Sequence, residues 1–74
     1  MEGKEKIKAQ FGIHLRKLLL ERNLSLRGLA SRSGLEYSLV QRIASGEVNL
    51  ELTTIYALAK GLGVPAASLM PEID

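Results

Sequence analysis

Apolar residues recur every three or four positions through most of the chain, which is the spacing of amphipathic helices. No segment shows the alternation of a β-strand. The pattern predicts an all-α fold of five helices, over residues 4–22, 26–33, 36–45, 50–62 and 65–70. The positions expected to face the core are Ile7, Phe11, Leu15, Leu18, Leu26, Leu29, Ala30, Leu39, Val40, Ile43, Leu52, Ile55, Leu58, Ala59 and Leu62.

Residues with known preferences for helix ends mark the predicted boundaries. Ser25 and Asn49 are suited to cap the second and fourth helices, because their side chains accept hydrogen bonds from free backbone N–H groups. Gly34 and Gly63 follow the second and fourth helices, where a residue with positive φ is favoured. Pro65 suits the first turn of the fifth helix. These signals agree with the periodicity and leave only short connections between the helices.

The chain has 74 residues, which is enough for one small domain with one core. We expect a single domain over residues 1–74, with its core over about 7–70 and frayed ends at 1–6 and 71–74. A core of this size supplies only a few kcal/mol, and the sequence contains no cysteine that could form a disulfide. The chain is therefore expected to gain stability by dimerising.

The residue types needed for catalysis or metal binding are almost absent. There is no Cys and only one His, His14, which has no nucleophile or carboxylate partner at a meaningful spacing. We therefore expect no enzyme activity, no metal and no cofactor. The longest apolar run is Leu18-Leu19-Leu20, and no signal peptide opens the chain, so the sequence predicts a cytoplasmic protein without a membrane span.

Charge is distributed unevenly along the chain. Residues 1–46 contain nine basic and four acidic side chains, whereas residues 47–74 contain one basic and four acidic side chains. The first part has the charge expected of a surface that binds a polyanion such as nucleic acid. A solvated surface with no ligand is the other interpretation of this excess.

The second and third predicted helices are joined by a turn of about three residues that contains Gly34. Two short helices connected in this way form a helix-turn-helix, in which the second helix enters a DNA major groove. Ala30 is small enough to lie where the two helices cross, and Val40 would fill the space beneath them. An αα-hairpin within a core would use the same residues, so the motif leaves both interpretations open.

The chain contains the segments F-G-I-H-L-R-K-L (11–18), N-L-S-L-R-G-L-A (23–30), S-G-L-E-Y-S-L-V-Q-R-I-A-S-G (33–46) and N-L-E-L-T-T-I-Y-A-L-A-K-G-L-G-V (49–64). With these segments it resembles the lambda-repressor-like, or Xre-type, helix-turn-helix family over Phe11 to Met70. The resemblance implies a transcriptional regulator that binds double-stranded DNA. The length and the ending V-P-A-A-S-L are most similar to small restriction-modification controller regulators, which dimerise through their last two helices.

Three positions depart from the pattern of this family. Leu26 stands where such proteins usually have a Gln that contacts the DNA backbone, so the resemblance does not imply that phosphate contact for this chain. Leu19 and Ala44 replace an Arg and a Glu that often form an ion pair. Because both partners are replaced by apolar residues, no buried charge is left alone. Leu19 and Ala44 are therefore predicted to have a structural role.

The exposed face of the third helix is the predicted surface for reading bases, with Tyr37, Ser38, Gln41 and Arg42 as candidates. Arg42 can donate two hydrogen bonds to guanine, although it could instead pair with Glu21 or Glu47. Tyr37 could contact a thymine methyl group or a phosphate, or pack against the end of the second helix. Glu36 could accept a hydrogen bond from cytosine, but capping of the third helix is the favoured role.

Other residues are assigned to the DNA backbone and to a dimer interface. The resemblance places phosphate contacts at Arg27, at Ser38 and in the loop around Asn49. The fourth helix has apolar residues on more than one face, which indicates either a fully buried helix or an interface. The resemblance favours an interface, and the candidates for it are Leu50, Ile55, Tyr56 and Leu69.

The sequence as a whole favours a homodimeric transcriptional regulator that binds a near-palindromic operator in double-stranded DNA. The two recognition helices of such a dimer would lie about 34 Å apart, facing successive major grooves. One alternative is an antitoxin-type autorepressor that also binds a toxin protein. Another is a protein-interaction module that keeps the fold without binding DNA.

Overall fold

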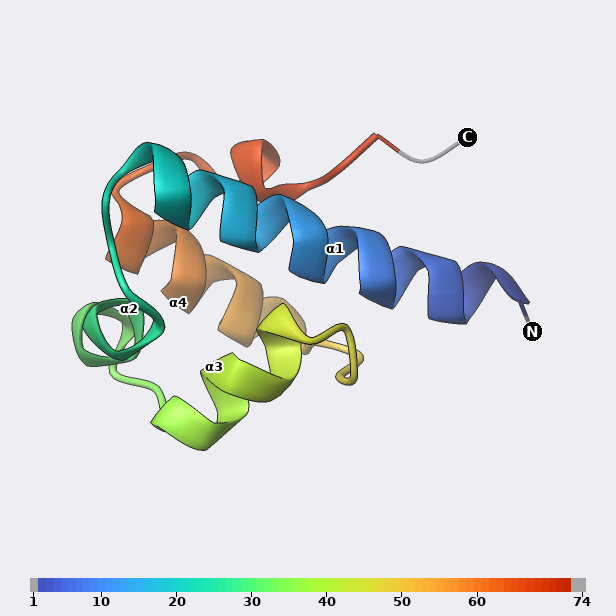
Figure 1. Ribbon diagram of the computed structural model, residues 1–74, viewed down its shortest axis with the longest axis horizontal. Helices are drawn as coiled ribbons and strands as arrows, with labels where there is room; N and C mark the ends of the chain where they lie inside the picture. Colours follow the sequence, from blue (N-terminus) through green and yellow to red (C-terminus); the bar gives the residue numbers. More distant parts are fainter. Residues whose placement is uncertain (1, 73–74) are drawn as a thin grey trace.

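The computed structural model describes residues 2–72. These residues form four α-helices and one short 3₁₀ helix, which confirms the predicted all-α fold (Figure 1). The helix α2 packs on α3 and α4, α1 packs on α3, and η1 packs on α4 and α1. The elements are α1 (Glu2–Glu21), α2 (Leu26–Ser33), α3 (Tyr37–Ala44), α4 (Leu52–Leu62) and η1 (Ala66–Leu69).

The fifth predicted helix is a single 3₁₀ turn rather than an α-helix. Its backbone bonds are of the tighter i to i−3 type, since Ser68 N donates to Pro65 O at 2.9 Å and Met70 N donates to Ala67 O at 3.2 Å. The segment lies between two prolines, Pro65 and Pro71, which leaves too few residues for a stable α-helical turn. The turn nevertheless returns the chain to the core, where Leu69 is buried.

The core is formed by one apolar stripe from each helix. Leu15, Leu29 and Leu58 are fully buried at its centre, as the periodicity predicted. Leu26, Leu39 and Ile55 are only partly buried and pack around it. The complete buried set is Phe11, Leu15, Leu18, Leu19, Leu29, Ala30, Val40, Ile43, Ala44, Leu58, Ala59, Leu62 and Leu69.

Two positions assigned to the core by periodicity are in fact exposed. The side chain of Ile7 is 52% exposed, because the N-terminal part of α1 extends beyond the other helices (Figure 1). The side chain of Leu52 is 67% exposed, because it is the first residue of α4 and lies before the turns that pack on α2. The apolar stripes of α1 and α4 therefore extend beyond the part of each helix that packs against the other helices.

Most of the helix boundaries follow the expected signals. The Ser25 hydroxyl accepts a hydrogen bond from Gly28 N at 3.0 Å and so caps α2. Gly34 and Gly63 adopt the left-handed conformation, with φ of 69° and 73°, and end α2 and α4. Asn49 does not cap α4, which begins at Leu52.

The late start of α4 has a packing reason. Val48 and Leu50 both pack against the core from the connection before α4, while Asn49 between them is exposed. This in–out–in order requires extended backbone. The helix can therefore begin only after these residues, and Glu51 takes the position before it without a side-chain cap.

The chain ends differ in part from the expected frayed segments. The helix α1 begins at Glu2, within the segment expected to fray, and Glu5 forms an ion pair with Lys8 at 3.1 Å. Residues 71–72 have no regular structure, and residues 1 and 73–74 lie outside the described part. Within residues 2–72 no helix combines the length and the apolar composition that a membrane crossing requires.

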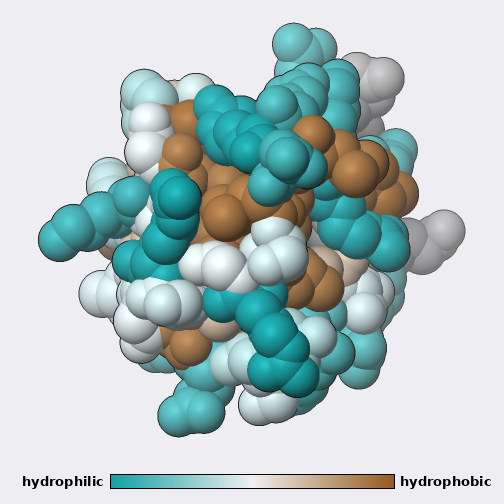
Figure 2. All heavy atoms as spheres, turned by 60° about the vertical axis from the view of Figure 1, so that its left-hand side comes forward, coloured by the Kyte–Doolittle hydropathy of each residue, from teal (hydrophilic) through white to brown (hydrophobic). Residues whose placement is uncertain are grey.

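Some large apolar side chains lie on the surface. Figure 2 brings forward the side of the molecule that lies at the left in Figure 1, and it shows a hydrophobic patch framed by hydrophilic side chains. The exposed set over the described residues comprises Ile7, Ile13, Leu20, Leu52, Tyr56 and Met70. Contiguous apolar patches of this kind are typical of interaction surfaces.

Candidate nucleic-acid interface

The pair formed by α2 and α3 has the predicted helix-turn-helix arrangement. Residues 34–36 join the two helices, and Leu35 N donates to Ala30 O at 3.0 Å across the turn. Ala30 and Val40 are buried, as the close approach of the two helices requires. In this arrangement the outer side of the short helix α3 faces away from α1 and α4.

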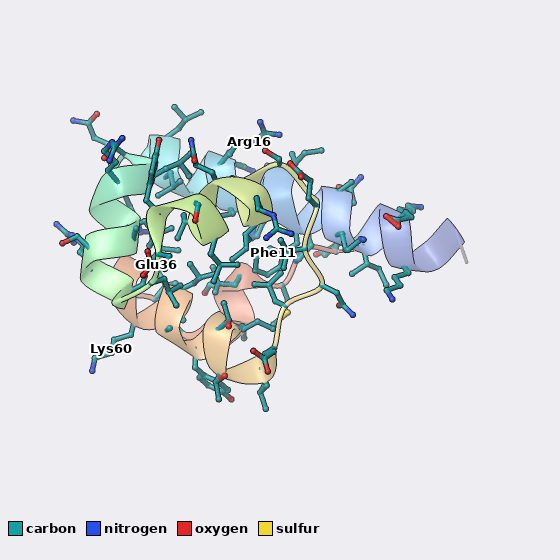
Figure 3. The ribbon with its side chains drawn as sticks, turned by 90° about the horizontal axis from the view of Figure 1, so that it is seen from below. Phe11, Arg16, Glu36 and Lys60 are labelled. Carbon is teal, nitrogen blue, oxygen red and sulfur yellow. The ribbon has the colours of Figure 1, made fainter. Side chains whose placement is uncertain are left out.

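The helix α3 is sharply divided into two faces. Val40, Ile43 and Ala44 are buried against the core, whereas Ser38, Gln41 and Arg42 are exposed. Figure 3 looks at the molecule from below and shows α3 on the near side, with side chains projecting from it. Polar groups on this outer face are free to form hydrogen bonds with a ligand.

Arg42 forms neither of the ion pairs considered from the sequence. Within the described residues the ion pairs are Glu5 with Lys8 and Glu21 with Arg22, the latter at 3.9 Å. Arg42 is exposed on the last turn of α3 and has no carboxylate of residues 3–72 within 4 Å. Its guanidinium group can therefore offer both of its in-plane edges to an incoming ligand.

Three candidate residues from two helices are brought into one cluster. The guanidinium carbon of Arg27 lies 4.0 Å from the centre of the Tyr37 ring. The Tyr37 hydroxyl accepts a hydrogen bond from Gln41 Nε2 at 3.0 Å. The ring of Tyr37 is thus covered by the side chain of Arg27, which is the second residue of α2.

Glu36 has no capping role in the structure. It occupies the position before α3, but its side chain makes no hydrogen bond to the first turn. A Glu side chain is one methylene longer than that of Asp, and the residues preferred at this position have shorter side chains. Glu36 is exposed beside the α2–α3 turn (Figure 3).

The remaining backbone candidates are Ser38 and Asn49, which make no contact with Arg27 among the side-chain hydrogen bonds of the described residues. Ser38 is exposed in the first turn of α3. Asn49 is exposed in the connection between α3 and α4. Both positions leave the polar side chain accessible to a ligand that lies along α3.

One of the four residues predicted for the dimer surface lies in the core. Leu69 is 1% exposed, because η1 folds back onto α1 and α4, so Leu69 belongs to the core and not to an interface. A hydrogen bond between His14 Nε2 and Ser68 O, at 2.7 Å, holds η1 against α1. Leu50 and Ile55 are partly buried, and Tyr56 is 60% exposed.

Sequence reasoning missed other exposed apolar residues near Tyr56. Leu52 lies four residues before Tyr56 and so shares its face of α4, and Met70 is also exposed after η1. The i, i+4 spacing of Leu52 and Tyr56 was a signal that could have separated this face from the core stripe. Leu52 and Tyr56 thus form an apolar surface on α4, and Met70 is a further exposed apolar side chain in the C-terminal half of the chain.

A second apolar feature, the leucine groove, lies at the junction of α1 and α2. It has a volume of about 240 Å³ and is lined by Arg16, Leu19, Leu20, Leu24 and Leu26. Leu20 is 82% exposed at its edge, whereas Leu19 is buried, as is Ala44, which confirms the structural role predicted for these two residues. The run of three leucines at 18–20 indicated that one leucine would be exposed, because one helical face cannot bury all three.

Comparison with known proteins places the chain among helix-turn-helix regulators. A family model described as Helix-turn-helix (HTH_3) matches residues 15–69. The restriction-modification controller protein C.AhdI from Aeromonas hydrophila is 35% identical, with a TM-score of 0.81 over 84% of this chain and 94% of that protein. An HTH_3 family transcriptional regulator from Vibrio cholerae is 26% identical, with a TM-score of 0.84 over 89% of this chain and 37% of that one. The comparison with curated proteins gave no match.

Proposed function

The chain belongs to the HTH_3 helix-turn-helix family of DNA-binding transcriptional regulators, and we propose that it acts as a homodimer on a near-palindromic operator. The observation that carries this proposal is the outer face of α3, where Ser38, Gln41 and Arg42 are exposed above a fully packed inner face. Such a face is suited to enter a major groove without any change in the core.

Each polar residue of the site has a proposed role. Arg42 donates to the O6 and N7 atoms of guanine, and Gln41 and Ser38 contact neighbouring bases. Arg27, Ser38 and Asn49 contact phosphates and fix the position of α3 in the groove. The excess of basic side chains in residues 1–46 favours this orientation toward DNA.

The proposed dimer uses the apolar surface of the C-terminal half. Leu52, Tyr56 and Met70 are exposed there, and Leu50 and Ile55 lie partly buried beside them. None of these residues belongs to α2 or α3, so their burial leaves the reading face of α3 free. The 35% identity to a restriction-modification controller protein supports a regulator of that type.

Selection of bound duplexes from a random DNA pool at about 0.15 M salt tests the proposed function directly. The expected product is a near-palindrome whose half-sites have centres about 10 base pairs apart. Such spacing would follow from two copies of α3 related by a two-fold axis. A pool without enrichment would overturn the proposed reading of DNA by α3.

Substitution of Tyr56 by Asp is expected to convert dimers into monomers. A carboxylate in the centre of an apolar interface raises the free energy of dimerisation by more than the loss of the Tyr56 contact alone. The reason is that the carboxylate loses its water without gaining a partner of opposite charge. We expect the dimer dissociation constant, measured by analytical ultracentrifugation, to rise by roughly tenfold or more. Ser31→Asp introduces the same charge at an exposed position on α2, outside the proposed interface, and serves as the control. Equal effects of the two substitutions would contradict an interface at Tyr56.

Binding to DNA is expected to weaken steeply with salt. A dimer that neutralises about eight phosphates should show a slope near −7 in a plot of log K against log salt concentration. The slope can be measured by fluorescence anisotropy with a labelled operator between about 0.05 and 0.2 M salt. A shallow slope would indicate that phosphate contacts contribute little.

The leucine groove favours a protein partner as a second candidate function. Leu20 is 82% exposed beside an apolar groove that DNA, a polyanion, has no reason to occupy. An antitoxin-type autorepressor or a protein-interaction module would use such a surface. The salt series separates the protein-interaction module from a DNA regulator, since a protein partner gives a shallow slope.

A further inference from the structure

We infer that Tyr37 is a positioning residue that orients Gln41 to read adenine, and that Arg27 couples this orientation to the DNA backbone. The inference rests on the proposed reading of DNA by α3. Its basis is the cluster of Arg27, Tyr37 and Gln41, which assigns Tyr37 a role other than direct contact with a base.

The Tyr37 ring is held in place from the α2 side. The guanidinium carbon of Arg27 lies 4.0 Å from the ring centre, which is within stacking distance. Tyr37 itself is partly buried and packs against the core, so the ring has little freedom to rotate away. A planar guanidinium group stacks on an aromatic ring in a way that the compact ammonium group of lysine does not.

The hydroxyl group of Tyr37 in turn fixes the amide of Gln41. One Nε2 proton of Gln41 is donated to the Tyr37 oxygen at 3.0 Å, between residues four positions apart on α3. The amide keeps its Oε1 acceptor and its second N–H donor free. These two groups match adenine, which offers an N6 donor and an N7 acceptor in the major groove.

Arg27 can hold Tyr37 and contact DNA at the same time. Stacking uses the face of the guanidinium group, whereas its N–H donors point outward in the plane. A phosphate bound at this edge would fix the plane over Tyr37 and, through Tyr37, the amide of Gln41. Phosphate contacts normally carry no sequence information directly. Here the backbone contact of Arg27 would also influence which base is accepted.

The experiment compares the sequences selected from a random DNA pool by the wild-type protein and by Gln41→Ala, Tyr37→Phe and Arg27→Lys. Gln41→Ala identifies the base pair that Gln41 reads. Tyr37→Phe retains the ring and removes only the hydroxyl, and Arg27→Lys retains the charge and removes the stacking plane. We expect both to reduce the preference for adenine at that same base pair by about fivefold or more. Arg32→Lys, at an exposed position on α2, is the control and should leave the selected sequence unchanged.

A measurement on the free protein tests the positioning without DNA. The side-chain amide resonances of Gln41, recorded by NMR, should shift in Tyr37→Phe because the bond from Nε2 is lost while the ring current remains. Unchanged resonances would overturn the positioning of Gln41 by Tyr37. If the resonances of the other residues are the same in Tyr37→Phe as in the wild type, the substitution acts only locally and the fold is unchanged.

The outcomes separate this inference from the proposed function. If the wild type enriches an operator and Tyr37→Phe selects the same sequence, the positioning role is wrong while the proposed function stands. If Tyr37→Phe loses base preference at a base pair other than the one read by Gln41, the positioning role of Tyr37 is also wrong. If Arg27→Lys lowers affinity equally for all sequences, the coupling through Arg27 is wrong. A wild-type pool without enrichment overturns both proposals.

Discussion

Replacement of Arg42 by Ala is expected to abolish the preference for one base pair in each half-site of the operator. A bidentate contact from arginine to guanine discriminates against the wrong base by about 1–3 kcal/mol, which is about 5- to 150-fold per half-site. Because a dimer contains two copies of α3, the combined loss of affinity for the operator should approach the square of this factor. This loss of affinity can be measured by competition between the operator and variants of it that differ at a single base pair.

The fold should not contribute to this loss. Arg42 is exposed and makes no ion pair with the side chains of residues 3–72, so Arg42→Ala should leave the melting temperature nearly unchanged. Arg32→Ala, at an exposed position on α2, removes the same charge away from α3 and should lower affinity only modestly and equally for all sequences. A variant Arg42→Ala that still prefers the same base pair would show that another residue reads it.

The helices themselves could be predicted because their signals are local. The spacing of Phe11, Leu15 and Leu18 depends only on the helical period, and the structure buries all three residues. The cap at Ser25 and the positive φ at Gly34 depend on one residue and its immediate neighbours. Information of this kind is present in any short window of the sequence.

The errors arise where burial depends on distant segments. Ile7 and Leu52 continue the periodic stripes of their helices, but the surfaces that would cover them end before these residues. The pattern places Leu69 on the outside because nothing local shows that η1 folds back onto α1 and α4. Asn49 is a good cap by type, yet the packing of the residues on either side of it keeps the backbone extended.

The candidate site shows the same division. The exposure of Ser38, Gln41 and Arg42 follows from the amphipathic pattern of α3, and the structure agrees with it. The stacking of Arg27 on Tyr37 could not be predicted, because it depends on the angle at which α2 and α3 cross. The leucine groove likewise requires the junction of α1 and α2 to be known.

Substitution of Gly12 by Ala is expected to destabilise the protein by about 3 kcal/mol. Gly12 lies on α1 where it meets the end of α3, and a Cβ atom there would lie 2.6 Å from Ala44 O and 3.0 Å from Gly46 N. These neighbours are backbone atoms, which cannot rotate away as a side chain does. The helices would have to separate, at a cost comparable to the total stability of a domain of this size.

The matched control is Gly3→Ala on the same helix. A methyl group at Gly3 would have no atom of another described residue within 4 Å, so alanine should stabilise α1 by about 0.5 kcal/mol through its higher helix propensity. Thermal unfolding followed by circular dichroism should therefore show a large decrease in melting temperature for Gly12→Ala and a small increase for Gly3→Ala. If the melting temperature changes in the same direction in Gly12→Ala and in Gly3→Ala, the close contact between α1 and α3 is contradicted.

The same contact connects stability to the reading of DNA. Gly12 packs against the residues that end α3, and Arg42 lies on the last turn of that helix. If the extra methyl group displaces this end of α3, Gly12→Ala should weaken operator binding even at temperatures where the variant is folded. Because base contacts require a precise position of α3 in the groove, the loss should be larger for the operator than for random DNA. Equal losses of affinity for the operator and for random DNA would indicate that the substitution changes only the fraction of the protein that is folded.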